Sequence, residues 1–599
     1  MIPPGYAAAI PAPAAAPRRN AEVADLIDRL GDLYELDGAV VYRVLAYHRA
    51  AASIREATES AMVLSEEGRL TELRDVGETI AAKVTELRTT GTIAALERLQ
   101  AKVPPGLVDI MHLPGIGAKT TRKLAEALGI TTLDELREAA EARRVRAVPG
   151  LGAKAEEKLL SAIAAGVQTR KGVVLLDRGL ARAETMLEEL RTHPACTAAS
   201  EAGSLRRRRE TIGDVDLIAA SDEPGALLAA FAASGAVAEV IARGETKCSV
   251  MGHDGLQVDL RVVPPASYGN LLQHFTGSKG HNVQMREDAA ARGFRVSEWG
   301  IEEVGTGEVF RTSNEDDVYR HLGYEPVPPE LREGRGELSL ARAGTLPRLV
   351  ELAEIRADLH THTTASDGKA SIAEMAAAAR ARGYGYYAVT DHSKAVGMGI
   401  GLDAGQMLEH VAAIRDHAAS LRQDGFHLLA GAEVDILVDG RLDYPDDVLA
   451  GLDWVVASVH GQQGLDRERM TARVCAAAAH PHVDVIGHPT GRQLGRREPF
   501  ELDLERVIAT CLDHGTFLEV NANPRRLDLR GSHVRTAIDA GVRIVISTDA
   551  HQTATLDYMQ HGVSTARRGW ATAADIVNTR EWDGFRALRK VGRPCAAAS

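Results

Sequence analysis

The fold of the central part of the chain is decided by the stretch GSLRRRRETIGDVD, residues 203–216. Its end predicts a strand over residues 215–219. Asp214 and Asp216 are two residues apart, so both carboxylates lie on one face of the chain there. Asp259, inside a second apolar stretch, offers a third carboxylate on what could be the neighbouring strand. Three such carboxylates suit two magnesium ions, the arrangement that in-line nucleotidyl transfer requires.

The residues before these aspartates have groups that bind phosphate. Gly203 and Ser204 supply a turn and a hydroxyl, and the arginines at 206–209 supply guanidinium groups for triphosphate oxygens. An arginine run on its own is more simply a solvated basic loop. Its place between Gly-Ser and Asp-x-Asp favours the interpretation as a phosphate site.

Upstream, the chain has a helical pattern with an internal repeat. The segments LPGIGAK at 113–119 and VPGLGAK at 148–154 each precede an amphipathic helix, and a degraded copy begins at Leu73. Such hairpins allow a tight backbone turn and present helix N–H groups to an anion such as a DNA phosphate. An ordinary turn between two helices is the alternative. The presence of two good copies favours DNA binding through their glycines, Gly115, Gly117, Gly150 and Gly152.

Downstream of residue 355, short apolar runs alternate with helical stretches. This alternation predicts parallel strands with crossover helices, and chemistry at the carboxyl ends of the strands. Most of the 21 histidines lie here, several beside Asp or Glu, and the motifs DLHTH, TDHS, GAE, VH, GHP and STDAH each follow or end an apolar run. A single histidine in such a place is more often structural. Their recurrence at equivalent places favours a multinuclear metal centre.

Composition limits the remaining classes. With 599 residues, 45% of them hydrophobic and 26% charged, the chain should form several globular domains. Its net charge of −13 argues against DNA binding by a bulk basic surface. The five cysteines form no CxxC pair, and no apolar run is long enough to cross a membrane, so we expect a cytoplasmic protein. The Ala/Pro-rich residues 1–19 are expected to form a disordered tail.

The central motifs resemble those of the X-family DNA polymerases, and the resemblance covers roughly residues 20–340. It rests on GSLRRRRETIGDVD and Asp259, with GETK at 244–247, FTGS at 275–278 and PPELR at 328–332. It implies that Asp214, Asp216 and Asp259 hold two catalytic ions, Mg²⁺ or Mn²⁺, and that Asp259 activates the primer 3′-hydroxyl.

The same resemblance assigns further residues by position. It implies that the triphosphate is bound by Ser204, Arg207 and Gly213, the sugar pocket is lined by Phe275 and Gly277, and the nascent base pair and template are contacted by Asn282 and Arg286. His274 stands where the family usually has Tyr. Lys83 aligns with the lysine that removes deoxyribose phosphate in some members, although a surface lysine is the alternative interpretation.

The C-terminal part, roughly residues 355–593, resembles the PHP domain, a distorted α/β barrel with three metal ions, here Mn²⁺ or Zn²⁺. The resemblance implies three ligand sets: His360, His362, Glu433 and Asp549; the bridging Glu433 with His460 and His488; and Asp367, His392 and His551. Arg492 and Arg526 are candidates for the substrate phosphate, with surface arginines as the alternative.

Together these interpretations predict a multidomain α+β and α/β protein. We expect a helical domain at 20–100, fingers with helix–hairpin–helix motifs at 101–170, a nucleotidyltransferase palm at 171–272, a thumb at 273–335, a linker at 336–354 and a TIM-like PHP barrel at 355–599. The resemblance implies a monomeric, nucleoid-associated repair polymerase. It would fill short gaps with dNTPs on gapped or primer-template DNA, and its PHP domain would act as a 3′–5′ exonuclease. The alternatives are a nuclease with a DNA-binding adaptor, and a polymerase with a purely structural PHP domain.

Overall fold

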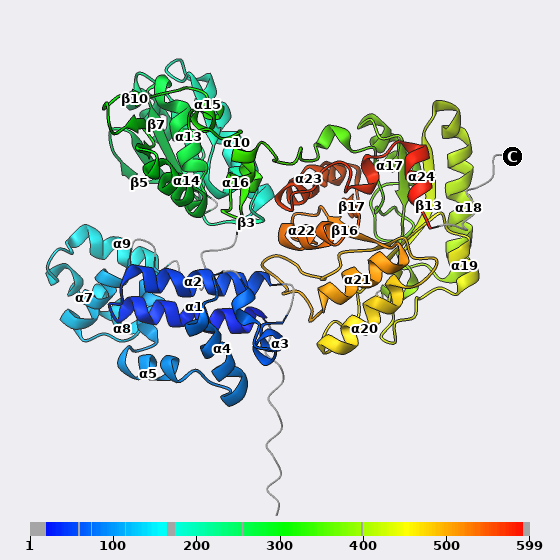
Figure 1. Ribbon diagram of the computed structural model, residues 1–599, viewed down its shortest axis with the longest axis horizontal. Helices are drawn as coiled ribbons and strands as arrows, with labels where there is room; N and C mark the ends of the chain where they lie inside the picture. The colour runs from blue at the N-terminus through cyan, green and yellow to red at the C-terminus, as the bar shows by residue number, and fades with distance from the viewer. Residues whose placement is uncertain are drawn as a thin grey trace, which may run out of the picture. The chain divides into compact units, whose positions relative to one another are not determined.

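The computed structural model describes residues 20–57, 60–73, 75–113, 116–164, 174–253, 255–396 and 399–590. The chain divides into two compact units, Met1–Gly172 and Val173–Ser599. The predicted disordered tail, residues 1–19, lies outside the described residues. Figure 1 shows that the first unit is helical and that the second contains the sheets.

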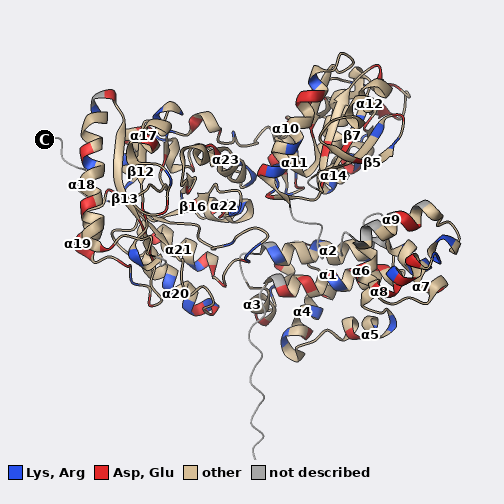
Figure 2. Cartoon of the chain, turned by 180° about the vertical axis from the view of Figure 1, so that it is seen from behind, with Lys and Arg blue, Asp and Glu red and all other residues tan. Residues whose placement is uncertain are grey.

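The described part of the first unit is built from helices around one apolar core. A Thr132 capping box begins α8, and glycines in the left-handed conformation, Gly91 and Gly129, end α4 and α7. Figure 2 shows acidic and basic residues interspersed along these helices. The α-helices are α1 (Asn20–Leu36), α2 (Val41–Glu56), α3 (Ala61–Glu66), α4 (Glu78–Thr90), α5 (Ala94–Lys102), α6 (Gly106–Met111), α7 (Ala118–Leu128), α8 (Leu133–Glu141) and α9 (Ala153–Ala164).

The second unit begins with a five-stranded sheet in the order β2-β4-β7-β6-β5. Strands β4 and β7 are neighbours, as the sequence suggested, and they run parallel. Helices α10 and α12 cover one face of the sheet, and α13 packs on the other. The elements are α10 (Leu176–Thr192), β2 (Ala198–Glu201), α11 (Gly203–Arg206), β4 (Val215–Ala220), α12 (Pro224–Ala232), β5 (Val237–Arg243), β6 (Lys247–Gly252), β7 (Gln257–Val263) and α13 (Tyr268–Thr276), with a short pairing of β1 (Val174–Leu175) and β3 (Thr211–Ile212).

The segment expected to be a linker is in part a folded element. Residues 336–354 contain α16 (Glu337–Ala343), between two left-handed glycines, Gly336 and Gly344. Its Leu338 and Ala341 are buried in the same cluster as residues of the thumb, so the helix completes that core. The other thumb elements are α14 (Lys279–Ala291), β8 (Phe294–Ser297), β9 (Gly300–Glu303), β10 (Val309–Phe310) and α15 (Glu315–His321).

The C-terminal part is a nearly closed barrel of parallel strands that pair in sequence order from β11 to β17. The two end strands are joined past their carboxyl ends, where Asp549 N donates to His360 O and His362 N to Ala550 O. One apolar cluster fills the inside of the barrel, and a larger one lies between the strands and the surrounding helices. The strands are β11 (Ala357–Asp358), β12 (Tyr386–Val389), β13 (His427–Asp435), β14 (Trp454–Ser458), β15 (Val485–Ile486), β16 (Phe517–Asn521) and β17 (Ile544–Ser547).

Helices surround this barrel, those from α17 to α22 as crossover connections and α23 and α24 after the last strand, and the predicted fold class is confirmed. They are α17 (Ile372–Ala381), α18 (Ala404–Leu421), α19 (Asp446–Ala450), α20 (Arg467–Ala478), α21 (Leu504–His514), α22 (Gly531–Asp539), α23 (Met559–Arg568) and α24 (Trp582–Leu588). Among the described residues, none of the helices combines the length and apolar character that a membrane span needs.

Candidate metal centres

The sheet of the second unit brings the predicted carboxylates together. Asp216 on β4 lies directly opposite Asp259 on β7, and Asp214 immediately precedes β4. Gly203 has a φ of 58°, and a Cβ atom there would lie 2.1 Å from Asp216 Oδ2. Only glycine therefore allows the start of α11 to approach this carboxylate so closely.

The electrostatics of these carboxylates fit a cation site. Burial, then the negative charges of Asp214 and Asp259, raise the pKa of Asp216 to about 6. Burial would also raise the pKa of Asp259, but hydrogen bonds, including those from Gln257 and Lys247, lower it. Lys247 alone does not neutralise three neighbouring carboxylates. Divalent cations would relieve the remaining repulsion, and oxygen ligands are those that Mg²⁺ and Mn²⁺ prefer.

The predicted nucleotide contacts lie around this site. Ser204 is half-buried in α11, and Gly213 is exposed just before β4. The Arg207 side chain donates to Thr276 O at 2.5 Å, and a Cβ atom on Gly277 would lie 3.1 Å from its Nη1. Arg261 stacks its guanidinium over the ring of Phe275, 4.5 Å from the centroid.

Asn282 and Arg286 lie on α14. The Asn282 amide is buried and bonded on both sides, since it donates to His274 O at 2.7 Å and accepts from Gln273 at 2.9 Å. Arg286 Nε donates to Asn282 O, one turn back along the helix. His274 is mostly buried, and burial lowers its pKa.

The arginine run is not the solvated basic loop that its sequence would suggest. Each of these arginines is paired with a carboxylate from another segment: Arg206 with Glu315, Arg207 and Arg209 with Glu333, and Arg208 with Glu201. The loop is therefore held by tertiary ion pairs, and its positive charge is largely compensated.

The predicted DNA and lyase residues lie in the first unit. Gly117 and Gly152 each come directly before a helix and have open space where a side chain would stand, and Gly150 has the left-handed φ of 80°. Gly115 lies outside the described residues. Lys83 is half-buried on α4.

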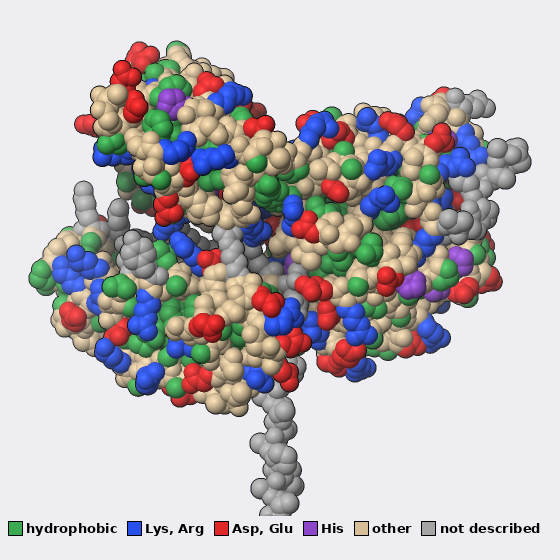
Figure 3. All heavy atoms as spheres, viewed as in Figure 1, with side chains coloured by type: hydrophobic (Ala, Val, Ile, Leu, Met, Phe, Trp, Pro, Cys, Tyr) green, Lys and Arg blue, Asp and Glu red, His purple; other side chains and the backbone are tan. Residues whose placement is uncertain are grey.

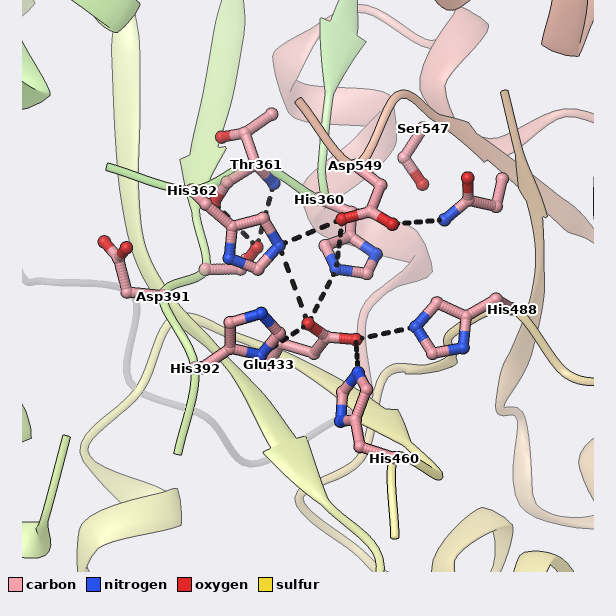
Figure 4. A network of polar contacts seen from close by, with 12 residues as sticks. His360, Thr361, His362, Asp391, His392, Glu433, His460, His488, Ser547 and Asp549 are labelled. Carbon is pink, nitrogen blue, oxygen red and sulfur yellow. Dashed lines mark hydrogen bonds and ion pairs between the residues drawn. The ribbon is translucent and has the colours of Figure 1, made fainter. Parts of the chain in front are cut away.

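The barrel gathers its ligand candidates around Glu433, which lies on β13 and is completely buried (Figure 4). Its two oxygens face different groups of imidazoles. Oε1 lies 3.0 Å from His488 Nε2 and 3.3 Å from His460 Nε2. Oε2 lies 2.9 Å from His392 Nδ1, 3.2 Å from His360 Nε2 and 3.6 Å from His362 Nε2. One carboxylate is thus placed to bridge two ions.

The remaining candidates extend this cluster. His551 Nε2 lies 3.2 Å and His392 Nε2 3.6 Å from Asp367, and His362 Nε2 lies 3.1 Å from Asp549. Three groups of donor atoms are compact enough for an ion: His362, Asp367, His392 and His551; His360, His362 and Asp549; and His392, Glu433 and His460. These groups contain eight of the nine predicted ligands, with His362 and His392 shared between groups, and the ninth, His488, contacts Glu433 at 3.0 Å.

The buried polar atoms of this cluster fit a metal centre. His360 Nε2, His392 Nδ1 and Glu433 Oε2 are buried, and no described residue forms a hydrogen bond with them. Burial alone would raise the pKa of Glu433, but His360, His460 and His392 lower it well below its ordinary value. A charged carboxylate beside imidazole nitrogens such as His360 Nε2 and His392 Nδ1, which have no hydrogen bond with a described residue, is the donor set that Mn²⁺ or Zn²⁺ takes.

Outer carboxylates orient the imidazoles, and the sequence interpretation missed them. Glu519, buried in β16, accepts from His360 Nδ1 at 2.7 Å and also from Ser547, while Asp435 lies 3.2 Å from His460 Nδ1. Each carboxylate occupies Nδ1 and so directs Nε2 toward the centre. The available signal was a glutamate inside the otherwise apolar strand run FLEV.

The two arginines proposed for the substrate phosphate differ in their surroundings. Arg526 lies at the centre, with Nε 3.3 Å from Asp549. Arg492 is buried and paired with Glu210 of the nucleotidyltransferase part, so it is neither a surface arginine nor free for a phosphate. The position of Arg492 therefore corrects the sequence interpretation.

Comparison with known families defines the class of protein. Family models match a helix-hairpin-helix domain at residues 18–93, a SAM-like helix-hairpin-helix tandem at 107–165, the DNA polymerase beta thumb at 271–333 and the PHP domain at 358–523. This order is that of a polymerase β-type enzyme joined to a PHP domain.

Sequence identity to individual proteins shows which family within this class the chain belongs to. The chain is 39% identical over 572 residues to "DNA polymerase/3'-5' exonuclease PolX" of Bacillus subtilis. The match covers 95% of this chain and 99% of that protein. The C-terminal part of this chain is 32% identical to a probable phosphatase of Caldanaerobacter subterraneus, and the match covers 32% of this chain and 75% of that protein. It is also 33% identical to a probable phosphatase of Acetivibrio thermocellus, and that match covers 32% of this chain and 78% of that protein. The chain belongs to the family X DNA polymerases that carry a C-terminal PHP domain.

Proposed function

We propose that this protein is a repair DNA polymerase that fills short gaps and processes 3′ ends with its PHP domain as a 3′–5′ exonuclease. The observation that carries this proposal is the presence of two complete ligand sets in one chain: the facing aspartates of β4 and β7, and the histidine cluster around Glu433. The relative from Bacillus subtilis is named for both activities.

In the polymerase site, Asp214, Asp216 and Asp259 would hold two Mg²⁺ or Mn²⁺ ions. Such ions, when bound, stabilise the charge on the transferred phosphoryl group and on the attacking and leaving oxygens. The residues of the chain position the reactants. Asp259 takes the proton of the primer 3′-hydroxyl, and the triphosphate is held by Ser204, Arg207 and the backbone at Gly213.

In the PHP site, three Mn²⁺ or Zn²⁺ ions would be held as the resemblance implies, with Glu433 bridging two of them. Ions of this kind supply a nucleophilic water at neutral pH. Arg526 is suited to orient the scissile phosphate, because its Nη1 forms no hydrogen bond with a described residue while its Nε rests against Asp549.

DNA would be held without a bulk basic surface. Both signs of charge are interspersed on the faces shown in Figure 3, and the chain carries a net charge of −13. Binding would therefore depend on hairpin N–H groups at Gly117 and Gly152 and on the bound ions, with weak affinity and a shallow salt dependence. The monomeric state, the nucleoid location and a lyase role for Lys83 stay predictions.

Two other functions are less well supported. A nuclease with a DNA-binding adaptor has no need of three neighbouring carboxylates, one of which, Asp216, has its pKa raised by burial and by the charges of the other two. A purely structural PHP domain has no need of nine converging ligands with oriented imidazoles.

The deciding experiment separates the two activities on gapped and 3′-overhanging DNA with Mg²⁺ or Mn²⁺. Asp214→Ala with Asp216→Ala should abolish extension and leave 3′ degradation intact, and His360→Ala with His362→Ala should do the reverse. Extension that survives the aspartate pair would refute the polymerase assignment. Degradation that survives the histidine pair would refute the nuclease assignment.

A further inference from the structure

The loop that carries the predicted triphosphate contacts is fixed to the PHP barrel. Both parts lie in the same compact unit, Val173–Ser599. Glu210, between Arg207 and Gly213, accepts from both terminal nitrogens of Arg492, at 2.9 and 2.8 Å. Arg492 in turn donates to Arg526 O and Leu527 O, in the loop that follows β16. The position of Glu210 is therefore set by the barrel.

A second contact reaches Arg207 itself. Arg568, the last residue of α23, uses Nη1 to donate to Glu333 at 3.0 Å and to the backbone oxygen of Arg207 at 2.7 Å. The same Glu333 oxygen accepts from Arg207 Nε at 3.3 Å. Arg568 thus binds the backbone of Arg207 directly, and it contacts the Arg207 side chain indirectly, through Glu333.

The Glu333 carboxylate forms ion pairs with three arginines, Arg207, Arg209 and Arg568. Burial alone would raise its pKa, but Arg568, Arg209 and Arg207 lower it to about 2, so it is a carboxylate at neutral pH. The Arg207 side chain is only 12% exposed and makes its other hydrogen bond to Thr276 O, at the sugar pocket. If Arg568 were neutral, Glu333 would attract Arg207 more strongly and compete with a triphosphate for its guanidinium.

We propose that the PHP domain is part of the polymerase's nucleotide site, with Arg568 and Glu333 as positioning residues that hold Arg207 for the triphosphate. This inference rests on the proposed role of Arg207. It assigns a function to an arginine that lies on a PHP helix and belongs to none of the nine predicted ligands.

The chain offers a matched control on the same helix. Arg567 also spans from α23 to the thumb, where it pairs with Glu330 at 2.8 Å, and it donates to Val350 O in the segment between the thumb and the barrel. Among the described contacts, it makes none with Arg207 or Glu333. Loss of Arg567 therefore removes a comparable ion pair between the same two parts and leaves the nucleotide loop untouched.

The test compares Arg568→Gln, Arg568→Lys and Arg567→Gln in the full-length protein, using single-nucleotide insertion on gapped DNA. Arg568→Gln should raise the KM for dNTP about tenfold and change kcat less, because charged hydrogen bonds that position a ligand group are lost. Arg568→Lys should restore part of the loss, since it keeps the charge but not both contacts. Arg567→Gln should leave the KM within about twofold.

Two readouts keep the result interpretable. Melting temperature and 3′ degradation in Mn²⁺ report whether each variant is folded. An equal rise of the KM in Arg568→Gln and Arg567→Gln, or no rise in Arg568→Gln, would overturn the inference. An Arg207→Ala variant with an unchanged KM for dNTP would instead refute the assignment of Arg207, which separates failure of the proposed function from failure of the coupling.

Discussion

The two candidate metal centres of this chain bring negative charge together for metal ions in opposite ways. In the palm, three aspartates meet at two neighbouring strands, and burial, then the negative charges of Asp214 and Asp259, raise the pKa of Asp216 to about 6. In the barrel, Glu433 is buried beside five histidines; burial alone would raise its pKa, but His360, His460 and His392 lower it well below its ordinary value. The palm therefore needs ions to relieve charge, whereas the barrel is largely compensated before ions bind.

This difference suggests different lifetimes for the bound ions. A half-open set of oxygen ligands with few outer partners suits ions that arrive and leave with the nucleotide. Buried imidazoles with Glu519 and Asp435 behind them suit resident ions, because outer hydrogen bonds keep the ligands oriented. Substitutions in either region test this contrast.

The largest effect should come from Glu433→Gln. Loss of an outer partner of a metal ligand costs about 10–100-fold, and Glu433 itself contacts five imidazoles, so 3′ degradation should fall more than about a hundredfold. Extension of a gapped primer should remain. A parallel loss of extension would show that the two centres are not independent.

A smaller effect should follow Glu519→Gln. The neutral amide oxygen accepts from His360 Nδ1 more weakly than the carboxylate does, so the Mn²⁺ concentration for half-maximal degradation should rise about 10–100-fold. Asp453→Asn is a matched control, because Asp453 is also a buried barrel carboxylate but lies at the start of β14, where it accepts from Ala430 N. Equal effects of the two variants would refute orientation of His360 by Glu519.

The link between the two regions should contribute to stability. Arg492→Met leaves the Glu210 carboxylate without its bidentate partner, which should destabilise this unit by about 3 kcal/mol and lower its melting temperature by several degrees at pH 7. Thermal unfolding of the full-length protein measures this effect, with Arg441→Met, an exposed arginine paired with Asp439, as the control. An unchanged melting temperature would contradict the role given to this pair.

The smallest effect is the pH dependence of the stability that Arg492→Met removes. Burial alone would raise the pKa of Glu210, but Arg492 lowers it to about 2 from an ordinary 4.5. Because its folded-state pKa is lowered, Glu210 stabilises the fold above about pH 4.5, and this stabilisation is lost as the pH falls toward 2. The difference in melting temperature between wild type and Arg492→Met should therefore shrink over this range. A difference that stays constant from pH 7 to 3 would contradict the charged pair.

Local sequence patterns predicted much of this structure, because they carry the relevant information. The Asp-x-Asp stretch and the apolar run around Asp259 indicated neighbouring strands, and β4 and β7 pair in that way. Motifs at strand ends followed from the general rule for α/β barrels, and the set of nine ligands from the resemblance to the PHP domain. The structure brings eight of the nine into compact groups and the ninth, His488, against Glu433.

The remaining features depend on residues far apart in the sequence. Arg492 and Glu210 are 282 positions apart, and neither local pattern indicates a partner. Glu519 was read as part of an apolar strand, because only the folded barrel shows that its side chain meets His360. The segment expected to be a linker contains glycines, but its Leu338 and Ala341 pack into the thumb core.

The most direct test of the contrast between the two centres is the metal content of the full-length protein after exhaustive dialysis. We predict that wild type and the Asp214→Ala, Asp216→Ala variant both retain about three ions per chain, since only the barrel holds resident ions. The His360→Ala, His362→Ala variant should retain fewer. Loss of retained metal from the aspartate variant would contradict the claim that only the barrel holds resident ions. The full wild-type metal content in the histidine variant would contradict it as well.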